Sequence, residues 1–156
     1  MRDNYILFSV GSTTYGLPSH DVAHVELVED VTRVPNAPAS VDGVVFSRGA
    51  VVPALNLRAR FGFERIPYDA RTRLIVVQQD GRSVGLIVDA AREFGTIPAD
   101  VIQPPAEGLT GTSGRYLHGV ATLGDRMILI LDVSELLNND EFTAAPSGAV
   151  RTPEEN

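Results

Sequence analysis

The amino-acid sequence predicts an all-β protein, built as two pseudo-symmetric five-stranded β-barrel subdomains packed side by side with a short C-terminal helix. Three observations predict this class: short apolar runs separated by turn residues, an internal repeat, and a single segment with clear helical character. Closing each small sheet into a barrel would remove the exposed strand edges that otherwise invite aggregation.

Pairs of apolar runs with turn residues between them are the signature of β-hairpins. Three such pairs are 5–10 with 13–17 around Gly11-Ser12, 73–77 with 84–88 around Asp80-Gly81, and 116–123 with 127–133 around Gly124-Asp125. A fourth hairpin is expected around Val44 and Val51, with Arg48-Gly49 at its turn. Hairpins therefore account for most of the chain.

Helical character is confined to the end of this β-rich region. Ser134-Glu135-Leu136-Leu137 predicts a short helix in which Ser134 is placed to act as the N-cap. A further helical turn is expected at 99–102. Beyond Phe142 the chain is rich in Ala, Pro, Ser, Gly and Glu, so 143–156 is predicted to be a disordered tail.

An internal repeat emerges when the sequence is aligned with itself. A shift of 69 positions brings Leu7-Phe8 onto Val76-Val77, Gly16-Leu17 onto Gly85-Leu86, and Val25 onto Phe94. A shift of 76 brings Gly43-Val44-Val45 onto Gly119-Val120-Ala121 and Leu55-Asn56-Leu57 onto Leu131-Asp132-Val133. The difference is a seven-residue insertion, expected between Pro104 and Gly114. Chance similarity between generic hairpins is the alternative, but the agreement of spacing over several elements favours a repeat.

Each half of the repeat is near the lower size limit for an independent core, so the halves are expected to pack on each other. We expect one domain over 1–142. Its first barrel would span about 15–65 and its second about 70–133, with the N-terminal strand and the C-terminal helix shared between them.

Composition excludes several classes of protein. The formal net charge is −7 and all thirteen basic residues are arginine, which disfavours nucleic acid as a partner. The absence of cysteine excludes disulfides and thiolate metal sites. Neither a signal peptide nor an apolar stretch long enough to span a bilayer is present, so a cytoplasmic protein without direct membrane insertion is expected.

The sequence supplies little of the chemistry that an enzyme needs. Only three histidines occur, His20, His24 and His118, and no Gly-x-Ser-x-Gly elbow accompanies them. His20 and His24 lie four residues apart, but no third metal ligand is evident. We therefore predict no catalytic residue and no metal site.

Two further patterns have ordinary structural explanations. The glycines between Gly108 and Gly114 resemble a phosphate-binding loop in composition, but a strand follows them and the chain has no lysine. Asp89, Glu93 and Asp132 are the candidate acid–base carboxylates, and strand ends and edges account for them. No cofactor is predicted.

Several motifs, in this order and at this spacing, resemble the CheW family of chemotaxis coupling proteins over residues 5–137. They are Tyr15-Gly16-Leu17-Pro18, Val31-Thr32-Arg33-Val34-Pro35, Val41-Asp42-Gly43-Val44, Arg48-Gly49 with Pro53, Asn56-Leu57-Arg58 with Arg60-Phe61-Gly62, Gly85-Leu86-Ile87-Val88-Asp89, and Leu123-Gly124-Asp125-Arg126. The resemblance implies two five-stranded barrels around a shared core, in agreement with the repeat.

The same resemblance implies a function and two partners. Members of the family are non-catalytic adaptors that bridge the cytoplasmic tip of a methyl-accepting chemotaxis receptor and the regulatory domain of a CheA-type histidine kinase. The implied location is the cytoplasm, at receptor arrays. The alternative, from a different class, is a small-molecule-binding β-barrel or an enzyme with its site in the groove between the barrels.

Matching the motifs residue by residue implies where partners would bind. Val22, Gly43 and Arg48-Gly49 would lie on or near the partner surface of the first barrel. Ala91 and Phe94 would approach the inter-barrel groove from the second barrel.

An apolar strip containing Val22, Val25 and Phe94 would suit a helical receptor tip. The alternative for Val25 and Phe94 is a place in the core, and Gly43 suits a backbone requirement better than a contact.

The sequence departs from the family at two places. His24 stands where the family commonly has a glutamate, so a pair between that acid and Arg48 is not expected in its usual form. The loop 103–108 is rich in proline and has no large apolar side chain near Ala106-Glu107. Both departures bear on the implied kinase and receptor interfaces.

Overall fold

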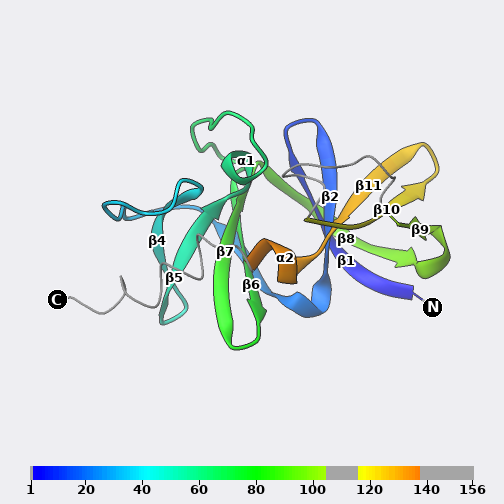
Figure 1. Ribbon diagram of the computed structural model, residues 1–156, viewed down its shortest axis with the longest axis horizontal. Helices are drawn as coiled ribbons and strands as arrows, with labels where there is room; N and C mark the ends of the chain where they lie inside the picture. The colour runs from blue at the N-terminus through cyan, green and yellow to red at the C-terminus, as the bar shows by residue number, and fades with distance from the viewer. Residues whose placement is uncertain (1, 105–115, 138–156) are drawn as a thin grey trace.

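The computed structural model describes residues 2–104 and 116–137. Two β-sheets lie side by side along the longest axis of the molecule (Figure 1). The five-stranded sheet, called barrel 1 below, has the order β3 (Val22–Leu27), β6 (Arg73–Gln79), β7 (Arg82–Val88), β5 (Ala50–Asn56), β4 (Val41–Ser47). The six-stranded sheet, called barrel 2, has the order β8 (Ala90–Pro98), β1 (Arg2–Val10), β2 (Thr13–Pro18), β11 (Arg126–Leu131), β10 (Leu117–Leu123), β9 (Ile102–Gln103).

Short helical segments complete the described fold. They are the 3-10 turns η1 (Ser19–Asp21) and η2 (Ala99–Val101) and the α-helices α1 (Leu57–Arg60) and α2 (Val133–Leu137). Helix α2 lies between the two sheets (Figure 1), and its residues Val133, Leu136 and Leu137 are buried there. No helix in the described part of the chain is long and apolar enough to cross a membrane.

Three apolar clusters explain how the two sheets are built. One cluster draws its residues from barrel 1 and its adjoining loop only, including Val45, Leu74 and Ile87. A second is confined to barrel 2 and η2. The third and largest lies between the sheets and takes residues from both, among them Phe8 and Leu86. Central strands such as β7 are buried on both faces, which is why their sequences are continuous apolar runs.

The predicted fold class is confirmed, and so are the four hairpins. Gly11-Ser12, Arg48-Gly49, Asp80-Gly81 and Gly124-Asp125 form the four turns, each between antiparallel strands in register. The expected helical turn near 99–102 is present as η2.

The division of the strands between the two barrels differs from the one predicted. Barrel 1 consists of the contiguous strands β3 to β7, whereas barrel 2 combines the hairpin β1–β2 with β8 to β11. The boundary predicted between 65 and 70 is therefore wrong, because hairpin 73–88 joins barrel 1 and hairpin 2–18 joins barrel 2. Each hairpin pairs with strands of the other repeat copy, through the parallel pairs β5–β7 and β11–β2.

The strand registers support the repeat found in the sequence. Leu7 faces Gly16 in β1–β2, and the equivalent Val76 faces Gly85 in β6–β7. Irregularities in β4–β5 at 41–43 and in β10–β11 at 117–119 are likewise equivalent.

The position of the insertion needs a partial correction. Gln103 faces Val120 where Thr32 faces Val44 in the first copy. Two of the seven extra residues therefore precede Gln103 instead of following Pro104. Most of the predicted 104–114 stretch, including the glycine loop, lies outside the described residues, as does the predicted tail at 143–156.

The helices show what the sequence prediction missed. Helix α1 was not expected, and Asn56 caps it by accepting a hydrogen bond from the Ala59 N–H at 3.2 Å. At the equivalent position, the Asp132 carboxylate accepts from the Glu135 N–H at 3.2 Å. Ser134 is therefore not the N-cap of α2, and its hydroxyl instead donates to the Gln79 side-chain oxygen at 2.7 Å.

Candidate partner-binding surface

The hairpin β4–β5 presents an exposed apolar pair beside a cationic tip. Phe46 and Val51 face each other across the two strands, and they are 74% and 65% exposed. The turn between them is Arg48-Gly49, and both residues have positive φ, 49° and 86°. Two positive φ angles define the tight turn whose twist matches that of the paired strands. Large apolar side chains left in water on a tight hairpin are typical of a contact surface.

Arg48 occupies this turn at a cost. The left-handed region suits glycine, asparagine and aspartate, whereas other residues lose about 1–2 kcal/mol there. The turn β6–β7 of the same barrel has Asp80, which tolerates its φ of 54°. Within the described residues, no hydrogen bond or ion pair joins the Arg48 side chain to another group. Its guanidinium is thus exposed and available to an acceptor on another molecule.

His24 lies inside barrel 1, not on its outer surface. Its side chain is 14% exposed, and its Nε2 lies 2.6 Å from Glu26 Oε2 and 2.9 Å from Ser47 Oγ. The buried Ser47 hydroxyl also donates to Glu26 Oε2 at 2.7 Å. His24 and Glu26 lie on β3, whereas Ser47 lies on β4, and these are the two edge strands of the sheet. The three side chains therefore join the edges of barrel 1.

The same three residue types occur in hydrolases, but this arrangement does not form a catalytic relay. In a relay, one ring nitrogen of the histidine contacts the nucleophile and the other contacts the carboxylate. Here Ser47 and Glu26 both contact Nε2 of His24. The serine hydroxyl also donates to the carboxylate directly, so the histidine has no position from which to withdraw its proton.

Gly43 has a structural role in the same barrel. Its φ is +153°, and a Cβ at this position would overlap the carbonyl oxygen of Thr32. Thr32 and Val44 exchange two backbone hydrogen bonds of 2.9 Å next to it. Gly43 is itself buried, so it supports the loop 28–40 against β4.

The candidate residues of β3 and β8 occupy equivalent places in the two barrels. Val25 faces Ile75 and Phe94 faces Ile6, in registers related by the repeat. Phe94 is 74% exposed, so its alternative placement in the core is wrong. Val25 is 36% exposed and lies at the surface as well.

Val22 and Ala91 are the other equivalent pair on these strands. Val22 is half-buried and packs against the cluster between the sheets, and Ala91 is half-buried too. Each precedes an irregularity in the pairing of its strand. Val22 therefore lies next to the core between the sheets, whereas Arg48 lies in the turn of the hairpin β4–β5.

Barrel 2 has a charged pair where barrel 1 has His24. Glu93 is the repeat equivalent of His24, and its carboxylate lies 3.8 Å from the guanidinium of Arg126. Met127, the equivalent of Val51, is 62% exposed. Barrel 2 therefore also has exposed apolar groups, but its turn residues Gly124-Asp125 are not cationic, and the adjacent Arg126 is paired with Glu93.

A cavity of ≈ 490 Å³ opens on barrel 1, between the loop 33–39 and Arg65. Arg65 donates to Asp42 Oδ1 at 2.8 Å and to the Ala39 carbonyl at 2.6 Å. Burial, together with a hydrogen bond to Asp42, raises the pKa of Tyr68 well above its ordinary value. These groups satisfy one another and hold the loop 61–72 on β4. In the described part of the chain, no three potential ligands converge to hold a metal ion.

Sequence reasoning missed two residues of this surface, Phe46 and Val51, and two residues inside barrel 1, Glu26 and Ser47. The run Val44-Val45-Phe46-Ser47 does not alternate between apolar and polar, so the outward direction of Phe46 is visible only when the register is known. Glu26 and Ser47 are polar residues that point inward at the end of a barrel. Only the spatial proximity of β3 and β4 indicates their contact.

The topology and the surface define a class: a two-barrel, pseudo-symmetric β domain with exposed apolar hairpin residues. The CheW-like domain family model matches residues 4–141 of the chain. The chain therefore belongs to the CheW family, as the motifs in its sequence predicted.

Individual relatives agree with this assignment. The chemotaxis protein CheW of Klebsiella aerogenes is 32% identical over 138 residues, covering 88% of this chain and 83% of the relative. The protein FrzA of Myxococcus xanthus is 31% identical over 139 residues, covering 87% and 86%. Among solved structures, the scaffolding protein TtCheW of Thermoanaerobacter tengcongensis superposes with a TM-score of 0.80 at 32% identity, covering 90% of this chain and 96% of that one.

Proposed function

We propose that this protein is a non-catalytic adaptor that couples the cytoplasmic tip of a chemotaxis receptor to the regulatory domain of a CheA-type histidine kinase. The names of its relatives, chemotaxis protein and scaffolding protein, support this role. The adaptor would act in the cytoplasm, at arrays of receptors.

The exposed hairpin β4–β5 carries this proposal. It combines Phe46 and Val51, which offer apolar area, with Arg48, which offers directional hydrogen bonds. A strained arginine at a turn indicates that its side chain serves something other than stability. A protein partner with an acidic group beside an apolar patch would match this surface.

The two barrels would divide the contacts. Arg48-Gly49 on barrel 1 would form one partner surface. Val22 and Val25 of barrel 1, with Ala91 and Phe94 of barrel 2, would meet the receptor tip in the groove. His24 would not touch a partner directly, since it faces Ser47 and Glu26. It would support the surface by joining β3 to β4.

The reading as an enzyme or a small-molecule-binding protein has no specific observation in its favour. The cluster of His24, Glu26 and Ser47 lacks relay geometry, because both partners contact the same Nε2. In the cavity beside Arg65, the guanidinium of Arg65 is already bonded to Asp42 and to the Ala39 carbonyl.

A binding assay with purified partners tests the adaptor role. The protein would be immobilised and offered a CheA-type regulatory domain and receptor-tip fragments from several cognate systems. Arg71→Glu is the matched control for Arg48→Glu, because Arg71 is also an exposed arginine, 79% exposed, and lies on the loop before β6.

Binding of both partners, weakened by Arg48→Glu and not by Arg71→Glu, is the expected result. Binding of neither partner across all cognate pairs would contradict the proposal. Equal loss in the two variants would show that overall charge, not the hairpin, controls binding.

A further inference from the structure

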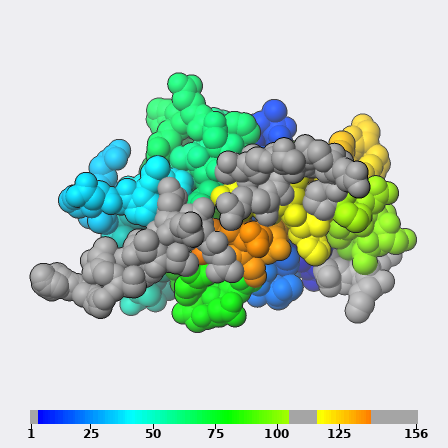
Figure 2. Space-filling view, in the orientation of Figure 1, coloured from blue at the N-terminus to red at the C-terminus, as the bar shows by residue number. Residues whose placement is uncertain are grey.

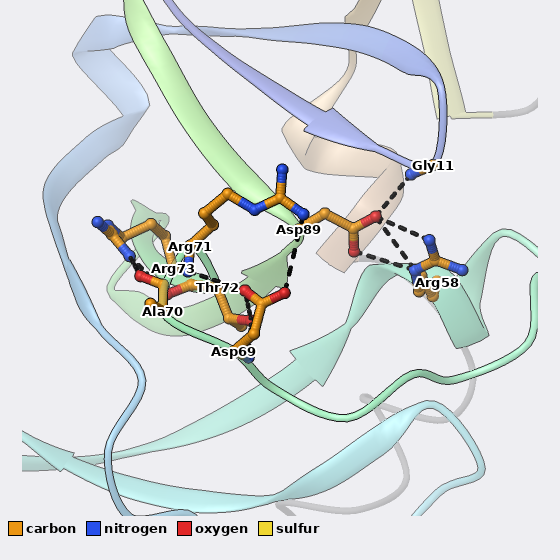
Figure 3. Close-up of polar contacts among 8 residues, drawn as sticks. All are labelled: Gly11, Arg58, Asp69, Ala70, Arg71, Thr72, Arg73 and Asp89. Atoms are coloured by element: carbon orange, nitrogen blue, oxygen red, sulfur yellow. Dashed lines mark hydrogen bonds and ion pairs between the residues drawn. The ribbon is translucent and has the colours of Figure 1, made fainter.

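One carboxylate collects hydrogen bonds from two distant segments of the chain (Figure 3). Asp89 Oδ2 accepts from the Gly11 N–H at 2.7 Å and from Arg58 Nη2 at 2.9 Å. Arg58 Nε lies 3.0 Å from the other oxygen, Oδ1, so the guanidinium binds the carboxylate through two nitrogens. Arg58 and Asp89 side chains are each only 20% exposed.

These three residues belong to different parts of the fold. Asp89 is the single residue between β7 of barrel 1 and β8 of barrel 2. Gly11 lies in the turn β1–β2 of barrel 2, and Arg58 lies in α1, directly after β5 of barrel 1. The Asp89 carboxylate thus connects both barrels at the point where the chain crosses between them. Its backbone N–H adds a bond to the Ser9 carbonyl at 3.0 Å.

The second cluster drawn in Figure 3 is local by comparison. Asp69 accepts from the Arg71 N–H at 2.8 Å, and its own N–H donates to the Thr72 hydroxyl at 2.8 Å. Its partners all lie within the same turn before β6. It can order that turn, but it does not connect the barrels.

The repeat allows the opposite side of the molecule to serve as an internal comparison. There the equivalents of Arg58, Asp89 and Gly11 are Ser134, His20 and Asp80. His20 is 77% exposed, and Ser134 makes one neutral hydrogen bond to Gln79 at 2.7 Å. Among the described residues, a charged connection through two nitrogens is present on one side only, because position 58 is arginine and position 134 is serine.

We propose that Arg58, Asp89 and the Gly11 N–H form a clamp that fixes the relative orientation of the two barrels. Arg58 and Asp89 are then positioning residues: they set the geometry in which the barrel 1 and barrel 2 surfaces face one partner together. The clamp is a property of the fold. Its effect on binding rests on the adaptor function proposed above.

Spin-label distances test the clamp without any partner. The chain has no cysteine, so Val51→Cys and Met127→Cys place labels only at these equivalent, exposed positions, one in each barrel. Asp89→Asn keeps the shape and removes the charge, and Arg58→Met keeps the length. Ser134→Ala is the matched control at the equivalent position.

The expected result is a distance distribution that widens at least about twofold in Asp89→Asn and Arg58→Met and is unchanged in Ser134→Ala. Circular dichroism and cooperative unfolding verify that each variant folds. If the two variants do not fold, Arg58→Lys keeps the charge and loses the two-nitrogen grip, and it should widen the distribution as well. Unchanged widths in folded clamp variants would overturn the clamp.

Partner binding tests the positioning role separately. Affinity for a receptor-tip fragment, which would contact both barrels, should fall about tenfold in Asp89→Asn, while Ser134→Ala binds like the parent protein. A widened distribution with unchanged affinity would overturn the positioning role and leave the clamp standing. If the parent protein binds no partner at all, the adaptor proposal fails, and the distance measurement still decides the clamp.

Discussion

At the scale of single residues, the hairpin tip shows a conflict between stability and the proposed contact. Arg48 has a φ of 49°, a region that arginine adopts with strain and asparagine tolerates. Among the described residues, its side chain makes no hydrogen bond or ion pair that would offset this cost. The partner contact proposed above would account for an arginine at this position.

Arg48→Asn should separate the two effects. We expect the free energy of unfolding to rise by roughly 0.5–1 kcal/mol, because the turn strain is relieved. Affinity for the barrel 1 partner should fall about tenfold, since the guanidinium is lost. Denaturant unfolding and calorimetric titration measure the two quantities. A variant that is less stable and binds equally well would show that Arg48 serves the fold.

Ser47 is the hydroxyl that connects His24 and Glu26 inside barrel 1. Ser47→Ala should lower the free energy of unfolding by about 1 kcal/mol, the usual value for one buried hydrogen-bonding group. Ser83→Ala is the control, because its hydroxyl accepts one exposed bond of 3.3 Å. Urea melts of both variants provide the comparison. Equal stability losses would show that the inward-facing cluster does not hold the edges together.

Gly43 and Gly49 lie in the same hairpin and differ in surroundings. Gly43→Ala should destabilise the protein by more than about 2 kcal/mol, because its Cβ meets the Thr32 backbone. Gly49→Ala meets no atom and should cost only about 1 kcal/mol of turn strain. Thermal melts check the difference. If Gly43→Ala is as stable as Gly49→Ala, the close approach of Thr32 is not a constraint.

At the scale of elements, the exchange of hairpins between repeat copies is the main organising feature. Barrel 1 is a continuous segment, from β3 to β7, inserted into barrel 2 between β2 and β8. The hairpins β1–β2 and β6–β7 each share the central core with the strands of the other copy. This arrangement ties the barrels together through both backbone pairing and apolar burial.

A designed disulfide tests the pairing of β1 with β8. Asn4 faces Thr96, 92 residues away, and their exposed side chains are hydrogen-bonded at 2.9 Å. The double variant Asn4→Cys, Thr96→Cys should oxidise to one intramolecular disulfide. It should then stabilise the protein by about 2–4 kcal/mol, because the closed loop is long.

The reduced double variant and the two single variants are the controls for this cross-link, and the natural lack of cysteine makes the background clean. Mass spectrometry and thermal melts give the readout. Intermolecular dimers without the intramolecular bond would contradict the exchanged topology.

Element boundaries and pairing within hairpins could be predicted because they depend on local signals. Turn residues such as Asp80-Gly81 and the spacing of glycines gave the hairpins and the repeat in correct register. Which barrel a hairpin joins depends on parallel pairs such as Ala54 with Gly85, and no local pattern encodes such a distant partner. Helix α1 was missed because it has four residues and no apolar period.

The candidate site was predictable to a similar degree. The family motifs singled out Arg48-Gly49, but they did not indicate whether the His24 side chain points into or out of the barrel. It points inward because residues along β3 alternate between the inner and outer faces. The repeat aligns Asn56 with Asp132, and both residues cap a helix. That alignment could have predicted helix α1 from the helix expected at 134–137.

At the scale of the whole molecule, the two barrels present different surface residues despite the internal repeat that relates them. Figure 2 shows β4 and its preceding loop at one end of the long axis and β8 with η2 at the other. Barrel 1 has Arg48 within its hairpin turn, whereas barrel 2 has Phe94 and Met127 exposed and its nearest arginine, Arg126, is paired with Glu93. Distinct surfaces on two connected barrels suit a protein that binds two different partners at once.

Simultaneous binding is therefore the most direct measurement. The protein would be mixed with a cognate kinase regulatory domain and a receptor-tip fragment, singly and together, and the masses measured by size-exclusion chromatography with light scattering. We predict a complex that contains all three components, and its loss or weakening with Arg48→Glu. Mutually exclusive binding, or binding of only one partner, would contradict the adaptor function.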